Sequence, residues 1–492
     1  MARAKSNPAD MTLGERWALR GPERQLLLWA LVAIGLGYLM LLGALPKDNI
    51  AVHLPELAPF VLYMAAFATA HAVLSMAGFR GDMMLLPVTA LLCGVGLMAQ
   101  VRMGVLDGPS RSLLDLLMLP AGLLLLLGVT LAGMRGRYRL LAGGASRRRA
   151  LWFWALASLG LLALLLVTGQ RFRGAVYGFG FLTPTELLKL TVVIYLAVFI
   201  DASMKALGRW RRPLPPLRTL RPLLIVWVLL CGMLLLQRDL GMVLILNLVL
   251  LVMLGLGTRH VGWWLYGGTA AVAAGGLLLG VFSHGQRRIE AWLSPFQDPT
   301  GAGWQVLQGL SGMYSGGLWG EGFSEGRPRY TPIAESDFIY AVIAEELGFF
   351  GSALLLLLFL ILIARLYTIA ARARTPFGML LATGIATVFA TQTLLNVGGV
   401  TKAIPLTGLT LPFISHGGSS LLTAFVSLGL VLAVSDGEPP KARGQGQRAK
   451  AGNASAAAPR RRGNSGSGSR GKRAPVGLGE ARGRGSASGR RG

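Results

Sequence analysis

The chain has 492 residues, of which 53% are hydrophobic and 14% are charged, and its mean hydropathy is +0.56. Soluble domains usually carry about 25% charged residues, so this composition excludes an ordinary soluble globular protein. Apolar runs of about 20 residues recur along the chain, and a helix of that length crosses a bilayer. The sequence therefore predicts an all-α polytopic membrane protein.

The formal charge of +26 is concentrated at the C-terminus, where residues 441–492 hold fourteen Lys or Arg and one acid, Glu480. This Gly-, Ser- and Arg-rich composition predicts a disordered basic tail that is attracted to anionic lipid headgroups. Nucleic-acid binding by such a tail is the less favoured reading. The two cysteines, Cys93 and Cys231, lie in apolar runs, and they predict neither a disulfide framework nor a metal site.

The apolar runs predict roughly twelve transmembrane helices. They are expected at about 25–44, 59–78, 84–101, 113–133, 151–168, 186–202, 222–237, 240–257, 261–281, 337–364, 377–396 and 413–434. The chain then divides into a basic N-terminus at 1–24, N-terminal membrane helices at 25–150, a membrane core at 151–435 and the basic tail at 436–492.

The distribution of Lys and Arg predicts the orientation, because cytoplasmic loops carry the excess of positive charge. The basic connections are 79–83, 134–150, 203–221, 258–260 and 365–376, and the connections poor in basic residues are 45–58, 102–112 and 397–412. Both termini are therefore expected in the cytoplasm. The large loop at 282–336, between the ninth and tenth spans, is expected on the extracytoplasmic side.

This outer loop combines charged, aromatic, Gly and Pro residues. Loops of such length are usually functional or disordered, and we expect order because the aromatic side chains need packing partners: Trp292, Phe296, Trp304, Tyr314, Trp319, Phe323 and Tyr330. Asp298 is followed by Pro299. It either starts a turn or acts as a catalytic carboxylate.

Glu186 and Lys189 lie three residues apart, on one face of a helix near its outer end. Thr183 and Glu186 fit a capping box, which is a purely structural explanation of the glutamate. A capping box does not explain Lys189, one turn into the membrane. An ionisable residue there indicates function.

Three other sites have both a structural and a functional interpretation, and a pair of glutamates needs a polar environment. Asp239 caps the next span or belongs to the site, and Glu345 and Glu346 need a cation or a polar cavity beside them because they lie about two turns inside their span. Arg287 and Arg288 are phosphate clamps or rim charges. Residues 416–420, His-Gly-Gly-Ser-Ser, form a glycine hinge or an anion site at a helix start.

Taken together and in order, these motifs resemble the SEDS family (shape, elongation, division and sporulation), to which the RodA and FtsW proteins belong. The matching segments are Pro184–Leu190, Gln237–Gly241, Pro295–Gln305, Ser315–Gly322, Glu335–Gly348, Asn396–Gly398 and Pro405–Ser420. The sequence departs from the family pattern at Thr185, Arg238, Trp304 and His416.

The resemblance implies a ten-helix SEDS-like catalytic core with an extra N-terminal helix pair. It also implies a peptidoglycan glycosyltransferase of the bacterial inner membrane that polymerises lipid II for elongation or division, together with a class B penicillin-binding protein. The family's catalytic positions fall on Asp298, Glu186 and Lys189. We expect substrate contacts from Arg288, Asp239, Gln305, His416, Gly417, Gly418, Ser419 and Ser420.

A reaction outside the cell needs a lipid pyrophosphate leaving group, because nucleotide-sugar donors are cytoplasmic. Asp298 is expected to act as general base on the acceptor 4-hydroxyl, while Lys189, Arg288 and residues 416–420 hold the pyrophosphate of the undecaprenyl-linked glycan. Mg²⁺ or Mn²⁺ could assist, although no ligand cluster of fixed spacing predicts a metal site. A lipid-linked precursor flippase and a non-catalytic scaffold are the alternatives.

Overall fold

The computed structural model describes residues 11–45, 54–106, 113–144, 146–172, 175–177, 183–209, 216–281, 283–301 and 303–436. The described residues end at Asp436, so the rest of the predicted basic tail lies outside them. Helices dominate the fold, and one short antiparallel hairpin accompanies them.

The chain forms the following elements: α1 (Leu13–Leu19), α2 (Gly21–Ala44), α3 (Leu54–Met76), α4 (Leu85–Arg102), α5 (Leu113–Gly133), η2 (Arg137–Ala142), α6 (Arg147–Thr168), β1 (Gln170–Phe172), β2 (Ala175–Tyr177), α7 (Pro184–Gly208), α8 (Leu217–Leu236), α9 (Leu240–Thr258), α10 (Gly262–Val281), α11 (Ser283–Leu293), η3 (Pro295–Gln297), α12 (Trp304–Gly316), η4 (Pro328–Tyr330), α13 (Ile339–Arg372), α14 (Pro376–Val400) and α15 (Gly418–Ser435).

Among the described residues, eleven helices are long and apolar enough to cross a membrane. The predicted all-α membrane architecture is thus confirmed. α10 occupies the expected run at 261–281 but is not one of these eleven, so the count of twelve spans stays a prediction.

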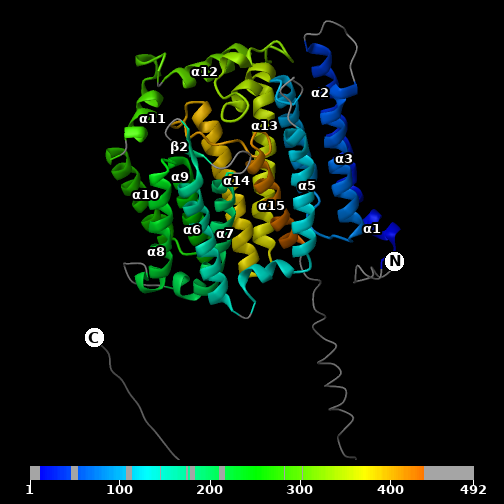
Figure 1. Ribbon diagram of the computed structural model, residues 1–492. Helices are drawn as coiled ribbons and strands as arrows, with labels where there is room; N and C mark the ends of the chain where they lie inside the picture. Colours follow the sequence, from blue (N-terminus) through cyan, green and yellow to red (C-terminus); the bar gives the residue numbers. More distant parts are fainter. Residues whose placement is uncertain are drawn as a thin grey trace, which may run out of the picture. The chain divides into compact units, whose positions relative to one another are not determined.

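The helices form a bundle around α14, in which α14 packs against α7, α9 and α13 while α5 packs along α15 (Figure 1). Within α14, 83% of the most apolar stretch is buried, the highest share among the eleven candidate spans. The polar side chains of α14 are all buried, namely those of Thr383, Thr387, Thr391, Gln392, Thr393 and Asn396.

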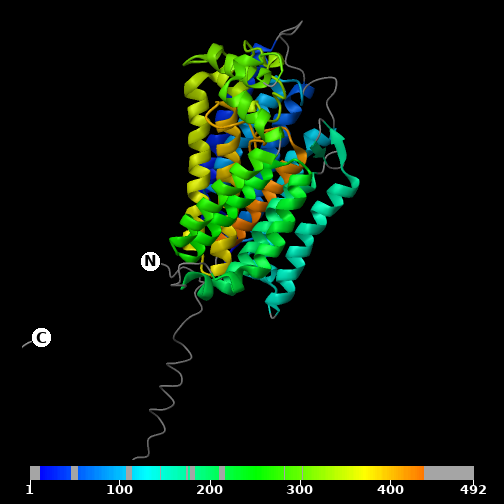
Figure 2. The ribbon, with the colours of Figure 1, turned by 90° about the vertical axis from the view of Figure 1, so that its left-hand side faces the viewer.

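Contacts between distant segments show which connections share an end of the bundle. At one end, the N–H of Arg80 and the N–H of Arg135 both donate to the Asp436 carboxylate over 2.9 Å, and Arg365 Nε lies 2.5 Å from Asp82 Oδ2. These connections are the ones that the charge distribution assigns to the cytoplasm. α11 and α12 cover the opposite end (Figures 1 and 2).

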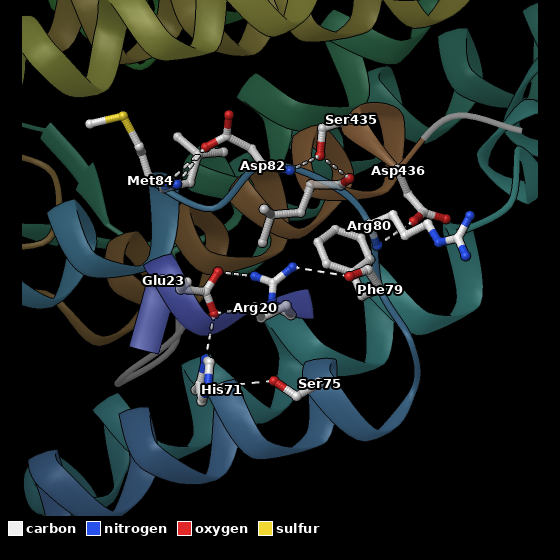
Figure 3. A network of polar contacts seen from close by, with 12 residues as sticks. Arg20, Glu23, His71, Ser75, Phe79, Arg80, Asp82, Met84, Ser435 and Asp436 are labelled. Carbon is white, nitrogen blue, oxygen red and sulfur yellow. Dashed lines mark hydrogen bonds and ion pairs between the residues drawn. The ribbon is translucent and has the colours of Figure 1, made fainter. Parts of the chain in front are cut away.

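The N-terminal helices α1 to α3 are joined to one another, and to the connection that follows α3, by a buried polar network (Figure 3). Arg20 pairs with Glu23 and donates to the Phe79 carbonyl oxygen, while His71 Nδ1 lies 2.7 Å from Glu23 Oε1. The side chains of Arg20 and Glu23 are fully buried. A buried charge is tolerated only when it is paired and hydrogen-bonded, so this network fixes how α2 and α3 are seated.

The described residues of 283–338, between α10 and α13, are called the outer segment after the side of the membrane that the charge distribution predicts for them, and their backbone is hydrogen-bonded to α13. α13 is interrupted at Gly348, where φ is +67°, and this frees backbone groups for other partners. The N–H groups of Glu321 and Gly322 donate to the carbonyls of Glu345 and Glu346, and Phe349 N–H donates to the Gly317 carbonyl. The interruption therefore replaces helical hydrogen bonds with bonds that fasten the outer segment.

The aromatic residues of this segment pack less than the sequence predicts. Trp292 is half-buried and donates through Nε1 to the Lys402 carbonyl over 3.0 Å, and Phe323 packs on the core. In contrast, the exposed fractions of Phe296 and Tyr314 are 78% and 90%. Trp319 is 80% exposed, but its ring packs against Phe350, with the ring centroids 4.8 Å apart. The predicted packing partners are therefore confirmed for Trp292, Phe323 and Trp319, while Phe296 and Tyr314 are largely exposed.

Candidate active site

Lys189 is a buried cation in the first two turns of α7, and its side chain is 4% exposed. Its Nζ lies 2.6 Å from Glu186 Oε2 and donates to Gln392 Oε1 over 3.1 Å. Glu186 is 15% exposed. The structure thus brings the predicted acid–base pair together as an ion pair, near the start of α7.

The capping box predicted for Thr183 and Glu186 is absent, since Thr183 precedes α7 without a side-chain capping hydrogen bond. Its backbone N–H donates instead to Ser419 Oγ over 3.0 Å, and the two hydroxyl oxygens are 2.7 Å apart. The capping interpretation is wrong because Thr183 forms hydrogen bonds with Ser419, at the start of another helix, instead of with its own helix. These contacts join the start of α7 to the start of α15.

Asp239 joins α8 to α9 and caps α9, accepting a hydrogen bond from Met242 N–H over 2.9 Å. Burial raises the pKa of the Asp239 carboxyl, while this hydrogen bond and the charges of Lys189 and Arg288 lower it. The structural role predicted from the sequence is confirmed. The electrostatic interactions also place Asp239 in the environment of Lys189.

Arg288 lies on α11 in the outer segment, and it reaches the connection between α14 and α15. Its Nη1 donates to the Leu406 carbonyl over 3.2 Å and to the Thr407 carbonyl over 2.9 Å. Burial raises the pKa of the Asp337 carboxyl, and a hydrogen bond from Ser336 and the charge of Arg288 lower it. Arg288 thus interacts electrostatically with Asp239 and Asp337, and the contacts of the described residues give no hydrogen-bond acceptor for its Nη2 and Nε groups.

Residues 416–420 divide between two environments. His416, Gly417 and Gly418 line a cavity between α3, α4 and α5, where His416 Nε2 lies 3.7 Å from Asp115 Oδ1. Ser419 and Ser420 instead contact Thr183 and Thr410. Only the serine end of the motif is therefore hydrogen-bonded toward the residues around Lys189.

Asp298 and Gln305 lie in the outer segment, on either side of the start of α12. Asp298 is exposed, and its Oδ1 accepts from Gly301 N–H over 3.0 Å, which is the turn that its neighbour Pro299 predicts. Gln305 is half-buried in the first turn of α12. The catalytic role of Asp298 and the substrate contact of Gln305 stay predictions.

Of the cation or polar cavity predicted beside Glu345 and Glu346, the structure gives Glu346 a cation, Arg102, which is the last residue of α4. Its Nε lies 2.6 Å from Glu346 Oε1, and its Nη2 donates to the carbonyls of Ser324 and Gly326. Glu345 Oε1 accepts from Arg327 N–H over 2.7 Å. The two glutamates therefore anchor the outer segment.

Metal-ligating side chains do not gather in groups of three or more within the described residues. The involvement of Mg²⁺ or Mn²⁺ therefore stays a prediction that no ligand set supports.

Gln392 and Thr410 lie next to Lys189 and Ser420, and neither was predicted from the sequence. Gln392 is 3% exposed in α14. A glutamine within an apolar span is itself a signal of a buried polar contact, although the sequence does not identify the partner.

Comparison with known proteins places these motifs in context. Residues 83–438 match the family model of the FtsW, RodA and SpoVE cell cycle proteins, so α2 and α3 precede the matched residues. Peptidoglycan glycosyltransferase RodA of Mycobacterium tuberculosis is 35% identical over 393 residues, which cover 76% of this chain and 82% of the relative. Stage V sporulation protein E of Bacillus subtilis is 36% identical over 259 residues, which cover 51% of this chain and 68% of the relative.

Among solved structures, a chain of similar fold occurs in a structure described as "Structural coordination of polymerization and crosslinking by a peptidoglycan synthase complex". The TM-score is 0.56 at 27% identity, and the match covers 72% of this chain and 97% of that chain.

Proposed function

The chain belongs to the FtsW, RodA and SpoVE family of cell cycle proteins, and from that premise we propose that it is a peptidoglycan glycosyltransferase that polymerises lipid II. The observation that carries the proposal is the buried Lys189–Glu186 ion pair at the start of α7, with Asp239 and Arg288 in electrostatic contact. A buried cation with free donor capacity suits an anionic leaving group.

In this reaction the Asp298 carboxylate takes the proton from the 4-hydroxyl of the acceptor sugar. The resulting oxygen attacks the anomeric carbon of the donor, and the bond from that carbon to the phosphate oxygen breaks. Lys189 and Arg288 stabilise the negative charge that develops on the departing lipid pyrophosphate. Glu186 holds the ammonium in place without taking part in bond making.

The substrate enters from the membrane, since the site lies among the ends of spanning helices. The protein is a multi-pass protein of the bacterial inner membrane, and we place α11 and α12 on the extracytoplasmic side with both termini in the cytoplasm. A class B penicillin-binding protein is the proposed partner, because the structural relative in a peptidoglycan synthase complex couples polymerisation to crosslinking.

The test uses purified full-length protein with lipid II, alone and with a candidate class B penicillin-binding protein, followed by gel analysis of glycan strands. We expect polymer from the wild type and none from Asp298→Asn. Sealed vesicles with lipid II on the outer face separate the alternatives. Lipid translocation without polymer would identify a flippase, and polymer that depends only on the partner's active site would identify a scaffold.

A further inference from the structure

Gln392 is a buried amide in the middle of the protein that the reaction above does not use. It lies on α14 and is 3% exposed. A polar group inside a membrane bundle is costly unless its hydrogen bonds are satisfied. The geometry of these bonds shows what the side chain does.

The orientation of the Gln392 amide is fixed by its partners. Oε1 accepts from Lys189 Nζ over 3.1 Å, and Nε2 donates to the Thr410 carbonyl over 2.9 Å and to Thr410 Oγ1 over 3.2 Å. An ammonium only donates and a carbonyl only accepts, so the reversed amide would face each partner with the wrong group. Gln392 therefore accepts a hydrogen bond from Lys189 and donates to Thr410, and its amide cannot be reversed.

The contact continues to α15. Thr410 Oγ1 accepts a hydrogen bond from Gln392 and lies 3.0 Å from Ser420 Oγ, where either hydroxyl can donate. In the arrangement in which Thr410 donates, Ser420 accepts, and its own hydroxyl hydrogen is left for another partner. Ser420 lies in the first turn of α15, where backbone N–H groups lack helical partners.

Lys189 also retains a donor. Two of its three N–H bonds point to Glu186 and Gln392, and the contacts of the described residues give no acceptor for the third. Both sides of Gln392 thus hold a hydrogen-bond donor that can turn to a ligand, a cation on α7 and a hydroxyl on α15. Together these donors suit an anion with several acceptor oxygens.

We propose that Gln392 is a positioning residue, which fixes the Lys189 ammonium and, through Thr410, the Ser420 hydroxyl as two donors of one site for the diphosphate of a lipid-linked substrate. Gln392 itself touches no substrate. The inference rests on the proposed function for the identity of the substrate, but the link between the two donors can be tested separately.

Two variants separate the contacts of Gln392, and a third is the matched control. Gln392→Met keeps the length of the side chain and removes both links. Gln392→Glu, when ionised, accepts from Lys189 but cannot donate to Thr410. Thr393→Val changes the adjacent residue of α14, whose buried Oγ1 has no hydrogen-bond partner among the described residues.

In glycan synthesis from lipid II by the full chain with its partner, we expect kcat of Gln392→Met to fall about 10- to 100-fold and KM to rise as well, because the two diphosphate donors lose their orientation. Thr393→Val should keep wild-type kcat. The kcat of Gln392→Glu relative to wild type should rise as the pH falls from about 8 to about 5.5, because the protonated acid regains the donor to Thr410. A role in folding alone would not produce this pH profile.

A binding measurement needs no polymerisation. Undecaprenyl pyrophosphate should raise the thermal unfolding temperature of the wild type and of Thr393→Val, and the rise should be lost in Gln392→Met.

Two results would overturn the proposal. One is that Gln392→Met matches Thr393→Val both in kcat and in the rise of the thermal unfolding temperature. The other is that the kcat of Gln392→Glu relative to wild type does not change with pH. If the wild type makes no glycan, the proposed function fails, while the thermal shift still decides the role of Gln392. If Gln392→Met does not fold, the pH profile of Gln392→Glu decides it.

Discussion

The carboxyl of Asp239 combines a structural and an electrostatic role, and these respond differently to substitution. Its pKa is raised by burial even though a backbone N–H and two cations favour the ionised form. A raised pKa in the folded state means that ionisation is harder there than in the unfolded chain, so the charge opposes folding once the pH exceeds the raised pKa.

Asp239→Asn removes this charge and keeps an oxygen for the hydrogen bond from Met242 N–H. We therefore expect the thermal unfolding temperature at neutral pH to stay level or rise, with the gain disappearing at acidic pH. The same variant should lower glycan synthesis, because Lys189 loses a neighbouring negative charge. A clear loss of stability at neutral pH would show that the carboxylate is needed for folding.

The Lys189–Glu186 pair allows stability and activity to be separated. Glu186→Gln leaves a buried ammonium without its carboxylate, and removal of one partner of a buried pair typically costs about 3–5 kcal/mol. Lys189→Met combined with Glu186→Gln should recover most of that loss, because no unpaired charge remains. Denaturant unfolding in detergent measures this stability.

Polymerisation should be absent from the Glu186→Gln, Lys189→Met double variant even though it folds. Recovery of activity together with stability would mean that the pair is only structural. The two measurements thus distinguish a catalytic cation from a packed ion pair.

At the scale of elements, the interruption of α13 at Gly348 determines where the outer segment sits. A Cβ on Gly348 would lie 2.3 Å from Gly320 N, and φ at Gly348 is +67°, which side-chain-bearing residues rarely adopt. The glycine is therefore required both by its backbone conformation and by the close approach of residues 317–320.

Gly348→Ala should destabilise the junction by about 1–3 kcal/mol through strain alone, and more if the two segments separate. We expect faster proteolysis around Glu321 and loss of glycan synthesis, while the spanning helices stay folded. Gly128→Ala, within helix α5, is the comparison, because a Cβ at Gly128 meets no atom within 4 Å. Equal proteolysis in the two variants would contradict the role of Gly348.

The network of Arg20, Glu23 and His71 is a second junction between elements, at the opposite end of the bundle (Figure 3). Burial lowers the pKa of Arg20 to about 10, against the favourable charges of Asp82 and Asp436. Arg20 therefore remains charged at neutral pH and needs Glu23.

Glu23→Gln should destabilise the packing of α1 to α3 by about 3–5 kcal/mol, the usual cost of leaving a buried charge unpaired. Hydrogen exchange in α2 and α3 should increase, and exchange in α14 should not. If hydrogen exchange in α2 and α3 of the variant were the same as in the wild type, the network would contribute little to stability.

At the scale of the whole molecule, the distribution of charge predicts how the bundle is oriented in the membrane. Arg148 and Arg329 are both exposed. Arg148 lies in the connection 134–150, which we place in the cytoplasm. Arg329 lies in the outer segment, which we place on the extracytoplasmic side. With Cys231 replaced by Ala, Arg329→Cys should react with a membrane-impermeant maleimide in intact spheroplasts. Arg148→Cys should react only after permeabilisation. The reverse pattern would invert the proposed orientation.

Much of the fold was predictable from the sequence because spans are encoded locally. A helix that crosses lipid must satisfy its own backbone and present apolar side chains, so runs such as 113–133 and 240–257 coincide with α5 and α9 almost residue for residue. The spacing of Glu186 and Lys189 was equally local, and their ion pair followed from it.

The remaining features depend on the packing of segments that are far apart in the chain. Arg102 with Glu346, Thr183 with Ser419, and Lys189 with Gln392 are separated by 244, 236 and 203 residues. No local pattern specifies such pairs, because each forms only when two helices meet at one depth. The sequence by itself determined a membrane bundle and the chemical character of its site. Only the tertiary structure decided the partners of each buried polar group, since these groups must find one another once water is excluded.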